Sequence, residues 1–278
     1  MKWGLRGEMK LKVRQVNYHV DIQGGGPPLI LLHGFTGSSK TWKPFMEEWS
    51  ASFTTIAIDF LGHGLSDIPR DYRRYTMEET LADLSQIMDQ LGINKAHVLG
   101  YSMGGRVAVA LASTYPDKID RLILESTSPG LETEEERSKR RKQDEALALE
   151  IEQKGIGPFV EKWENLPLFA TQKQLPHHVR EKVRQERLAQ SPQGLANSLR
   201  GLGTGNQPSY WPALKKFSFP VLILAGAKDT KYCHIARQMA RFIPQATLKI
   251  VPCAGHTIHL EKPQFFAKVV VDYLFSTP

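Results

Sequence analysis

Residues 100–104 read Gly-Tyr-Ser-Met-Gly and place Ser102 between glycines two positions away on either side. An apolar run at 96–99 precedes this segment, and an alanine-rich helical pattern begins at Arg106. A strand that turns sharply into a helix, with serine at the apex, is a nucleophile elbow. Glycines are needed there because the apex backbone is strained and neighbouring backbone passes close by. We therefore predict that Ser102 is chemically active.

A serine gains reactivity when a histidine takes its proton and an acid orients that histidine. Asp229 follows one predicted strand, and His256 follows the last one. The chain order Ser, Asp, His is typical of α/β-hydrolases, and open parallel sheets bind ligands at the edge where such loops emerge. We predict a triad of Ser102, His256 and Asp229. Two alternatives are that Asp229 only caps a helix, and that Glu125, at the end of another strand, is the acid.

Negative charge that develops on a reacting oxygen needs two backbone N–H groups aimed at it. We expect one from Met103, directly after the serine, and one from Phe35 in the His-Gly-Phe-Thr-Gly loop at 33–37. His259, three residues after His256, could suggest a metal site, but no third ligand accompanies it. We expect His259 to pack near a helix start, and we predict neither a metal nor a cofactor.

Arg106 is a residue that simple ester hydrolysis does not require. It lies four positions after Ser102, and helical side chains lean toward the N-terminus, so its guanidinium can reach the cleft. The glycines and alanines around it indicate a helix packed closely on the sheet. A buried charge without a partner is costly, so Arg106 needs an anion. That anion is either a structural carboxylate or a substrate carboxylate held by two hydrogen bonds.

Three further residues are ambiguous from the pattern alone. Arg140 lies in a charged helical stretch, with Glu136 and Asp144 four residues to either side, as on a solvent-exposed helix. Trp163 would ordinarily belong to a hydrophobic core. Arg187 is equally open to a structural or a functional interpretation.

These residues need a scaffold, and strand-like runs alternate with helix-like ones along the chain. Such alternation predicts an α/β fold in which helices flank a mainly parallel sheet. Residues 11–22 predict an antiparallel hairpin. Further strands are expected at 29–32, 54–58, 96–99, 121–124, 221–224 and 248–251, and helices at 76–91, 235–242 and 263–275.

Residues 129 to about 210 interrupt this alternation with a charged, helical segment punctuated by prolines and glycines. We predict that 130–210 form a helical lid inserted between the sixth and seventh strands. Residues 1–129 and 211–278 then form the α/β-hydrolase core. A separate domain is less favoured, because the apolar face of the segment is thin.

Composition narrows the choice of function. The 278 residues contain no apolar run near the roughly 20 residues of a membrane span, so no membrane insertion is expected. The first eight residues lack the apolar stretch of a signal peptide, which predicts a cytoplasmic protein. The net charge of +7 is modest and dispersed, which disfavours nucleic acid and suits an anionic small substrate. Nothing in the sequence indicates an oligomeric state.

Four motifs together resemble the α/β-hydrolase superfamily over most of the chain. They are H-G-F-T-G from 33, D-F-L-G-H-G-L-S from 59, G-Y-S-M-G-G from 100 and A-G-H-x-x-H-L-E-x-P from 254. A narrower set of residues resembles one branch, the synthases that make 2-succinyl-6-hydroxy-2,4-cyclohexadiene-1-carboxylate (SHCHC) in menaquinone biosynthesis. This set comprises 100–108, 128–131, Arg137 with Arg140 and Asp144, Trp163 with Pro167 and Phe169, and Arg187.

The narrower resemblance implies a small polycarboxylate substrate and a set of residues that bind it. That set is Tyr101, Arg106, Arg140, Trp163 and Arg187. It also implies a lyase that eliminates pyruvate from 2-succinyl-5-enolpyruvyl-6-hydroxy-3-cyclohexene-1-carboxylate. Ser102, activated by His256, would then remove a carbon-bound proton without forming an acyl-enzyme.

Two other classes of function stay open, because one fold hosts many reactions. The main alternative is a serine hydrolase with the same triad, either a carboxylesterase or an enzyme that cleaves carbon–carbon bonds in diketo acids. The third is a non-catalytic ligand receptor built on this fold.

Overall fold

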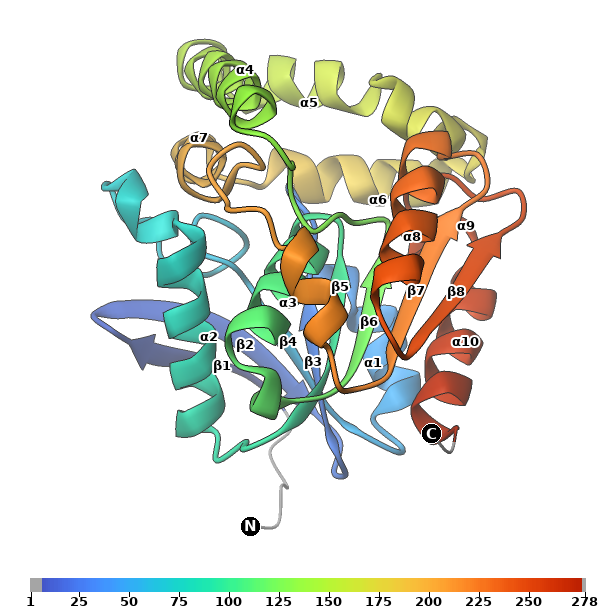
Figure 1. Ribbon diagram of the computed structural model, residues 1–278. Helices are drawn as coiled ribbons and strands as arrows, with labels where there is room; N and C mark the ends of the chain where they lie inside the picture. Colours follow the sequence, from blue (N-terminus) through green and yellow to red (C-terminus); the bar gives the residue numbers. More distant parts are fainter. Residues whose placement is uncertain (1–6, 277–278) are drawn as a thin grey trace.

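The computed structural model describes residues 7–276, in which one eight-stranded sheet forms the centre (Figure 1). The strands lie in the order β1-β2-β4-β3-β5-β6-β7-β8. Strand β2 is antiparallel to both of its neighbours, and all pairs from β4 to β8 are parallel. The strands are β1 (Gly7–Val13), β2 (Val16–Gln23), β3 (Pro28–Leu32), β4 (Thr54–Ile58), β5 (Ala96–Tyr101), β6 (Ile119–Glu125), β7 (Val221–Gly226) and β8 (Ala246–Val251). This topology confirms the predicted α/β fold.

Helices cover both faces of the sheet. Side chains of α2 (Met77–Gln90), α3 (Met103–Thr114) and α8 (Thr230–Phe242) join the apolar core on one face. Those of α1 (Lys43–Trp49) and α10 (Pro263–Phe275) join the core on the other. The short helix α9 (Ile258–Glu261) leads from β8 toward α10. Because the inner strands are buried on both faces, they read as continuous apolar runs in the sequence.

A helical segment lies between β6 and β7 and covers one end of the sheet (Figure 1). A small apolar cluster that includes Ile151, Phe159 and Leu195 packs its helices together. The helices are α4 (Glu134–Lys154), α5 (Ile156–Glu164), the 3-10 helix Pro167–Gln174, α6 (His177–Leu188) and α7 (Pro192–Leu202). We propose that 130–210 act as a lid on a core formed by 1–129 and 211–278, of which 1–6 and 277–278 lie outside the described residues.

The two ends of this inserted segment are joined to each other. The N–H of Tyr210 donates to the carbonyl of Pro129 at 2.8 Å. The indole N–H of Trp211 donates to the carbonyl of Gly130 at 3.1 Å. The chain therefore leaves the core and returns to it at neighbouring points.

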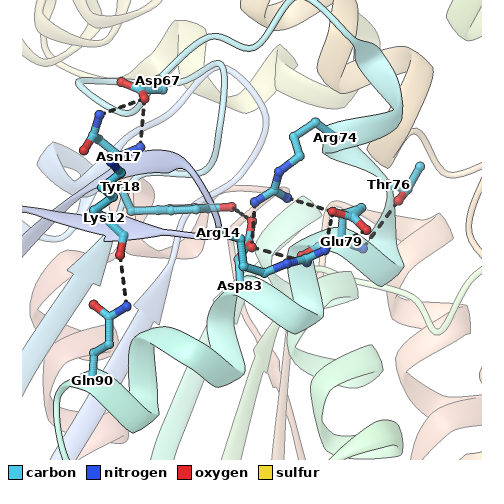
Figure 2. Close-up of polar contacts among 10 residues, drawn as sticks. All are labelled: Lys12, Arg14, Asn17, Tyr18, Asp67, Arg74, Thr76, Glu79, Asp83 and Gln90. Carbon is cyan, nitrogen blue, oxygen red and sulfur yellow. Dashed lines mark hydrogen bonds and ion pairs between the residues drawn. The ribbon is translucent and has the colours of Figure 1, made fainter.

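The β1–β2 hairpin is fastened to α2 by a group of charged side chains, the hairpin cluster (Arg14, Tyr18, Arg74, Glu79 and Asp83; Figure 2). The buried carboxylate of Asp83 accepts from the Tyr18 hydroxyl at 2.6 Å and from Arg74 at 2.7 Å. Glu79 accepts from Arg14 at 3.0 Å and from Arg74 at 3.1 Å. Each guanidinium in this cluster thus has carboxylate partners.

Within residues 7–276, every helix is too short or too polar to cross a lipid bilayer.

Candidate active site

Ser102 occupies the sharp turn between β5 and α3. Its φ of 49° and ψ of −105° lie outside the regions that L-residues ordinarily adopt. A side chain at Gly100 would clash with the backbone of Gly104, and one at Gly104 would clash with the carbonyl of Leu32. The turn is held by a hydrogen bond from the Ser102 N–H to the carbonyl of Glu125 at 2.9 Å. The glycine spacing thus reflects the close approach of backbone segments.

The structure brings Ser102, His256 and Asp229 together from three loops at one edge of the sheet. Nε2 of His256 lies 3.1 Å from Oγ of Ser102, and Nδ1 lies 2.7 Å from Oδ2 of Asp229. With its proton on Nδ1, the ring can accept the serine proton at Nε2. Oδ1 of Asp229 also accepts from the N–H of Tyr232 at 3.2 Å, so Asp229 both caps α8 and orients the histidine.

Glu125, the alternative acid, contacts the other histidine. Both of its carboxylate oxygens lie 2.9 Å from Nδ1 of His259, and one also accepts from the His259 backbone N–H at 3.0 Å. This pair is buried, and the ring of Tyr101 packs against His259 at 4.6 Å between centroids. The two histidines near the serine therefore each have their own carboxylate.

The two predicted oxyanion donors, Phe35 and Met103, line the same cavity as Ser102. Neither backbone N–H donates to an acceptor among residues 7–276. The loop that carries Phe35 is fixed by His33, whose Nδ1 lies 2.8 Å from the carbonyl of Gly34 and whose Nε2 accepts from the N–H of Phe60 at 3.1 Å. These contacts require a neutral imidazole, and burial lowers the pKa of His33 accordingly.

A cavity of about 340 Å³ opens over the serine between the sheet and the inserted helices. Its lining combines the serine and histidine with cationic, aromatic and apolar side chains. Among them are Tyr101, Ser102, Arg106, Arg140, Leu147, Trp163, Phe169, Leu199, Lys231, Tyr232 and His256. A pocket of this size and composition suits a small anionic molecule with an apolar ring.

Arg106 reaches this cavity and has only neutral partners. Its Nη1 donates to Oε1 of Gln207, and its Nη2 donates to the carbonyl of Leu202 at 2.8 Å. No Asp or Glu side chain among residues 7–276 forms an ion pair with it. Burial and the nearby Arg140 lower the pKa of Arg106 to about 10, so it stays charged at neutral pH. The buried carboxylate of Asp144 interacts with Arg106 electrostatically, but no carboxylate among the described residues contacts the guanidinium directly.

Arg140 and Trp163 reach the same cavity from α4 and α5. Nε of Arg140 donates to Oδ1 of Asp144 at 2.8 Å, one of the ion pairs that the helical spacing predicted. Burial raises the pKa of Asp144, and its second oxygen has no partner among the described residues. Trp163 packs on Phe35 at 5.4 Å between ring centroids. Arg140 therefore has a structural partner and a place on the cavity wall.

Arg187 departs from the expectation that all three arginines line one cavity. It is buried, its guanidinium lies 5.1 Å from the centroid of the Phe169 ring, and it donates to Gln172 at 3.1 Å. It lines a neighbouring space of about 60 Å³. Phe35, Tyr101 and Phe169 line both spaces. The rings of these residues place Arg187 beside the serine cavity rather than on it.

Some residues of the cavity were not predicted from the sequence. Tyr232 packs on His256 at 4.6 Å between ring centroids, and Lys231 lies next to it on α8. The position of Asp229 as a helix cap could have indicated both, because they begin the helix that it caps. Gln207 lies in an irregular loop, and no motif marks it. No cluster of three or more His, Cys, Asp or Glu side chains within 7–276 is arranged to hold a metal ion.

Comparison with known proteins agrees with this architecture. A family model described as the alpha/beta hydrolase fold matches residues 27–263. The chain therefore belongs to the α/β-hydrolase fold family.

Three relatives narrow this class. The chain is 43% identical over 263 residues to a Bacillus subtilis protein provisionally named 2-succinyl-6-hydroxy-2,4-cyclohexadiene-1-carboxylate synthase, with 94% of this chain and 96% of that protein covered. The structure of MenH from S. aureus superposes with a TM-score of 0.88 at 38% identity, covering 92% of this chain and 97% of that one. A malate-bound thermophilic esterase from Thermogutta terrifontis superposes with a TM-score of 0.83 at 29% identity. The superposition covers 96% of this chain and 97% of the esterase chain.

Proposed function

We propose that this protein is a lyase of menaquinone biosynthesis. It eliminates pyruvate from 2-succinyl-5-enolpyruvyl-6-hydroxy-3-cyclohexene-1-carboxylate and yields SHCHC. The observation that carries this proposal is the buried guanidinium of Arg106, which bonds directly to no carboxylate among the described residues, in the cavity of Ser102 and His256. A neutral ester would leave that charge unpaired, whereas a carboxylate would pair with it. The similarity to a named SHCHC synthase over nearly the whole chain supports the same reaction.

The names of substrate and product define the bonds that change. The ring double bond moves from C3–C4 to C2–C3 and C4–C5, so a proton leaves C2 and the enolpyruvyl oxygen leaves C5. C2 adjoins the succinyl carbonyl, and removal of its proton gives an enolate. Ser102 takes this proton after passing its own to His256, and Asp229 stabilises the imidazolium. The electrons then expel the enolate of pyruvate, which becomes pyruvate when its methylene carbon takes up a proton, and His256 releases the proton that it took from Ser102.

The enolate oxygen needs stabilisation in the transition state. The free N–H groups of Met103 and Phe35 supply it, and in comparable sites one such donor is worth about 3–4 kcal/mol. Arg106 and Arg140 bind substrate carboxylates within the serine cavity, and Arg187 binds one that extends past Phe169. Tyr101 and Trp163 enclose the ring. We place the enzyme in the cytoplasm, because a substrate with three carboxylates does not cross a lipid bilayer unaided.

A serine hydrolase is the second candidate, and one observation favours it. The esterase from Thermogutta terrifontis shares 29% identity and nearly the whole fold with this chain. In a hydrolase, Ser102 would attack a carbonyl carbon and water would release the acyl group.

The deciding experiment offers the purified protein the enolpyruvyl substrate and, separately, nitrophenyl esters. We expect pyruvate release with weak ester turnover. Ser102→Ala should lower pyruvate release by about 10³-fold or more, as removal of an activated serine does in related triads. Ser113→Ala, on the same helix, is the matched control and should retain activity, because Ser113 bonds only to the Val109 carbonyl.

Other outcomes identify the alternatives. Rapid ester turnover without pyruvate release would favour the hydrolase. Binding of the enolpyruvyl substrate without turnover of either compound would favour the receptor.

A further inference from the structure

Gln207 is a direct partner of Arg106, one of the arginines that line the serine cavity. It follows α7 in the loop that leads back to the core, and its side chain is almost fully buried. Oε1 accepts from Nη1 of Arg106, and Nε2 has no acceptor among the described residues. In the reverse orientation of the amide, Nε2 would face the guanidinium, and two hydrogen-bond donors would oppose each other. The contact with Arg106 therefore determines the orientation of the amide.

The neutral partner of Arg106 contrasts with the partners of the arginines in the hairpin cluster. In the hairpin cluster, Arg74 donates to the buried carboxylate of Asp83 at 2.7 Å. A glutamate has nearly the same shape as glutamine, so a carboxylate would fit against Arg106 equally well. It would form a buried ion pair and neutralise the guanidinium. The amide instead orients the guanidinium with one hydrogen bond and leaves its charge in place.

The lone Nε2 indicates that this arrangement is not optimised for stability. A buried polar group without a partner costs about 1–3 kcal/mol. The nearby Gly130 leaves the amide room, since a side chain there would collide with Nε2. The fold therefore keeps an incompletely hydrogen-bonded amide in direct contact with the guanidinium of Arg106.

We propose that Gln207 is a positioning residue that aims Arg106 at the serine cavity and keeps its positive charge available for a substrate carboxylate. This role presupposes that the cavity binds a polycarboxylate, as in the proposed function. Gln207 thereby sets specificity for anionic over neutral substrates without touching the substrate itself.

The test compares Gln207→Glu with Gln207→Leu in the pyruvate-release assay. We expect Q207E to lower kcat/KM by about 100-fold, mainly through KM, because an internal carboxylate competes with the substrate for Arg106. Q207L should lower it by less than about 10-fold, because only one hydrogen bond to Arg106 is lost. The thermal midpoint of Q207E should equal or exceed that of the wild type, and that of Q207L should fall.

A purely structural role predicts the opposite order, because leucine disturbs the packing and hydrogen bonding more than glutamate does. A wild-type KM in Q207E, or a greater loss in Q207L than in Q207E, would therefore overturn the proposal.

The result remains decisive even when the reaction assignment fails. If the wild type releases no pyruvate, the lyase assignment is wrong, and calorimetric titration with tricarballylate then tests Gln207 directly. Binding by the wild type that weakens at least tenfold in Q207E would support the role of Gln207. Equal binding by both proteins, or no binding to the wild type, would overturn it.

Discussion

The hairpin cluster and the serine cavity both contain arginines, which are exposed or half-buried in the first, whereas Arg106 is buried in the second, and the two regions place different groups opposite the guanidinium. In the hairpin cluster, Arg14 and Arg74 face the carboxylates of Glu79 and Asp83. In the cavity, Arg106 faces an amide and a backbone carbonyl. The first arrangement fastens a hairpin to a helix. The second leaves a buried charge without a directly bonded carboxylate, which is unfavourable for folding and favourable for binding an anion.

The partner of the guanidinium distinguishes a structural arginine from a ligand-binding one, which the sequence alone does not. An arginine whose charge is balanced within the fold should matter for stability and little for activity. One whose charge is left open should matter for activity and little for stability. Substitutions in the two regions should therefore have different effects, and each region needs its own control variant.

The largest effect is expected from Arg106→Met, which removes the open charge and keeps much of the side-chain volume. We expect kcat/KM for pyruvate release to fall by about 10³-fold, the loss of a buried charged contact to a substrate carboxylate. The free energy of unfolding should change by less than about 1 kcal/mol, because removal of a buried charge offsets the lost hydrogen bonds. Steady-state kinetics measures kcat/KM, and urea unfolding measures the free energy of unfolding.

Arg141→Met is the matched control for this experiment. Arg141 lies on α4, pairs with Glu134 at 2.5 Å, and does not line the serine cavity. Its activity should stay within about twofold of the wild type, since exposed ion pairs contribute little. Equal losses in R106M and R141M would remove the distinction between open and balanced charges.

A smaller effect, on stability alone, is expected from Asp83→Asn in the hairpin cluster. This change removes the buried carboxylate that accepts from Arg74 and Tyr18, while the half-buried Arg74 keeps its contact with Glu79, so we expect a loss of about 1.5–3 kcal/mol. Activity per folded molecule should not change, because the cluster lies away from the cavity lining. Urea unfolding with parallel kinetics provides the measurement.

Asp89→Asn, on the same helix, is the control for the hairpin cluster. Asp89 pairs with Lys118 at 2.5 Å in an exposed position, so its loss should change stability by less than about 1 kcal/mol. A D83N protein as stable as D89N would show that Asp83 does not hold the hairpin.

The smallest effect concerns a group that is buried uncharged, His63. Burial and the neighbouring His33 lower the pKa of His63 to about 3. Below pH 6.5 the unfolded chain therefore takes up a proton that the folded one does not. Stability is complete above pH 6.5 and falls by about 1.4 kcal/mol per pH unit toward pH 3, or about 2 kcal/mol at pH 5.

Urea unfolding at pH 8, 6.5 and 5 measures this dependence, and His63→Asn should reduce the loss between pH 8 and pH 5. His19 acts in the opposite sense, because its contact with Asp59 raises its pKa. The stabilisation from His19 is complete below pH 6.5 and is lost as pH rises through its folded pKa. If H63N loses as much unfolding free energy between pH 8 and pH 5 as the wild type does, groups other than His63 cause that loss.

Local sequence patterns predicted much of the fold and part of the candidate site. The strand at 54–58 and the helix at 263–275 have the bounds that the sequence predicted, because apolar runs and an initial proline mark their ends. Helix α8 begins at Thr230 rather than at 235, because Asp229 caps it earlier than the apolar period shows. The contacts among Ser102, Asp229 and His256 could be predicted because a strained turn and two strand exits leave signatures in neighbouring residues.

Features that depend on packing between distant segments left no such signature. The side of Phe169 on which Arg187 lies is set by how α6 packs against the 3-10 helix Pro167–Gln174, which no spacing in the chain encodes. The contact between Arg106 and Gln207 joins residues 101 positions apart through an irregular loop. The sequence could show that Arg106 needs an anion, but not that its nearest partner would be neutral.

The paired ends of the inserted segment have an evolutionary consequence. Because Tyr210 bonds to Pro129 and Trp211 bonds to Gly130, the segment begins and ends at neighbouring points, and a change in its length need not move the strands β6 and β7 that flank it. The triad lies wholly outside that stretch, whereas Arg140, Trp163 and Arg187 lie inside it. Changes between residues 130 and 210 therefore alter the lining of the cavity in related proteins, while the loops that hold Ser102, Asp229 and His256 stay in place.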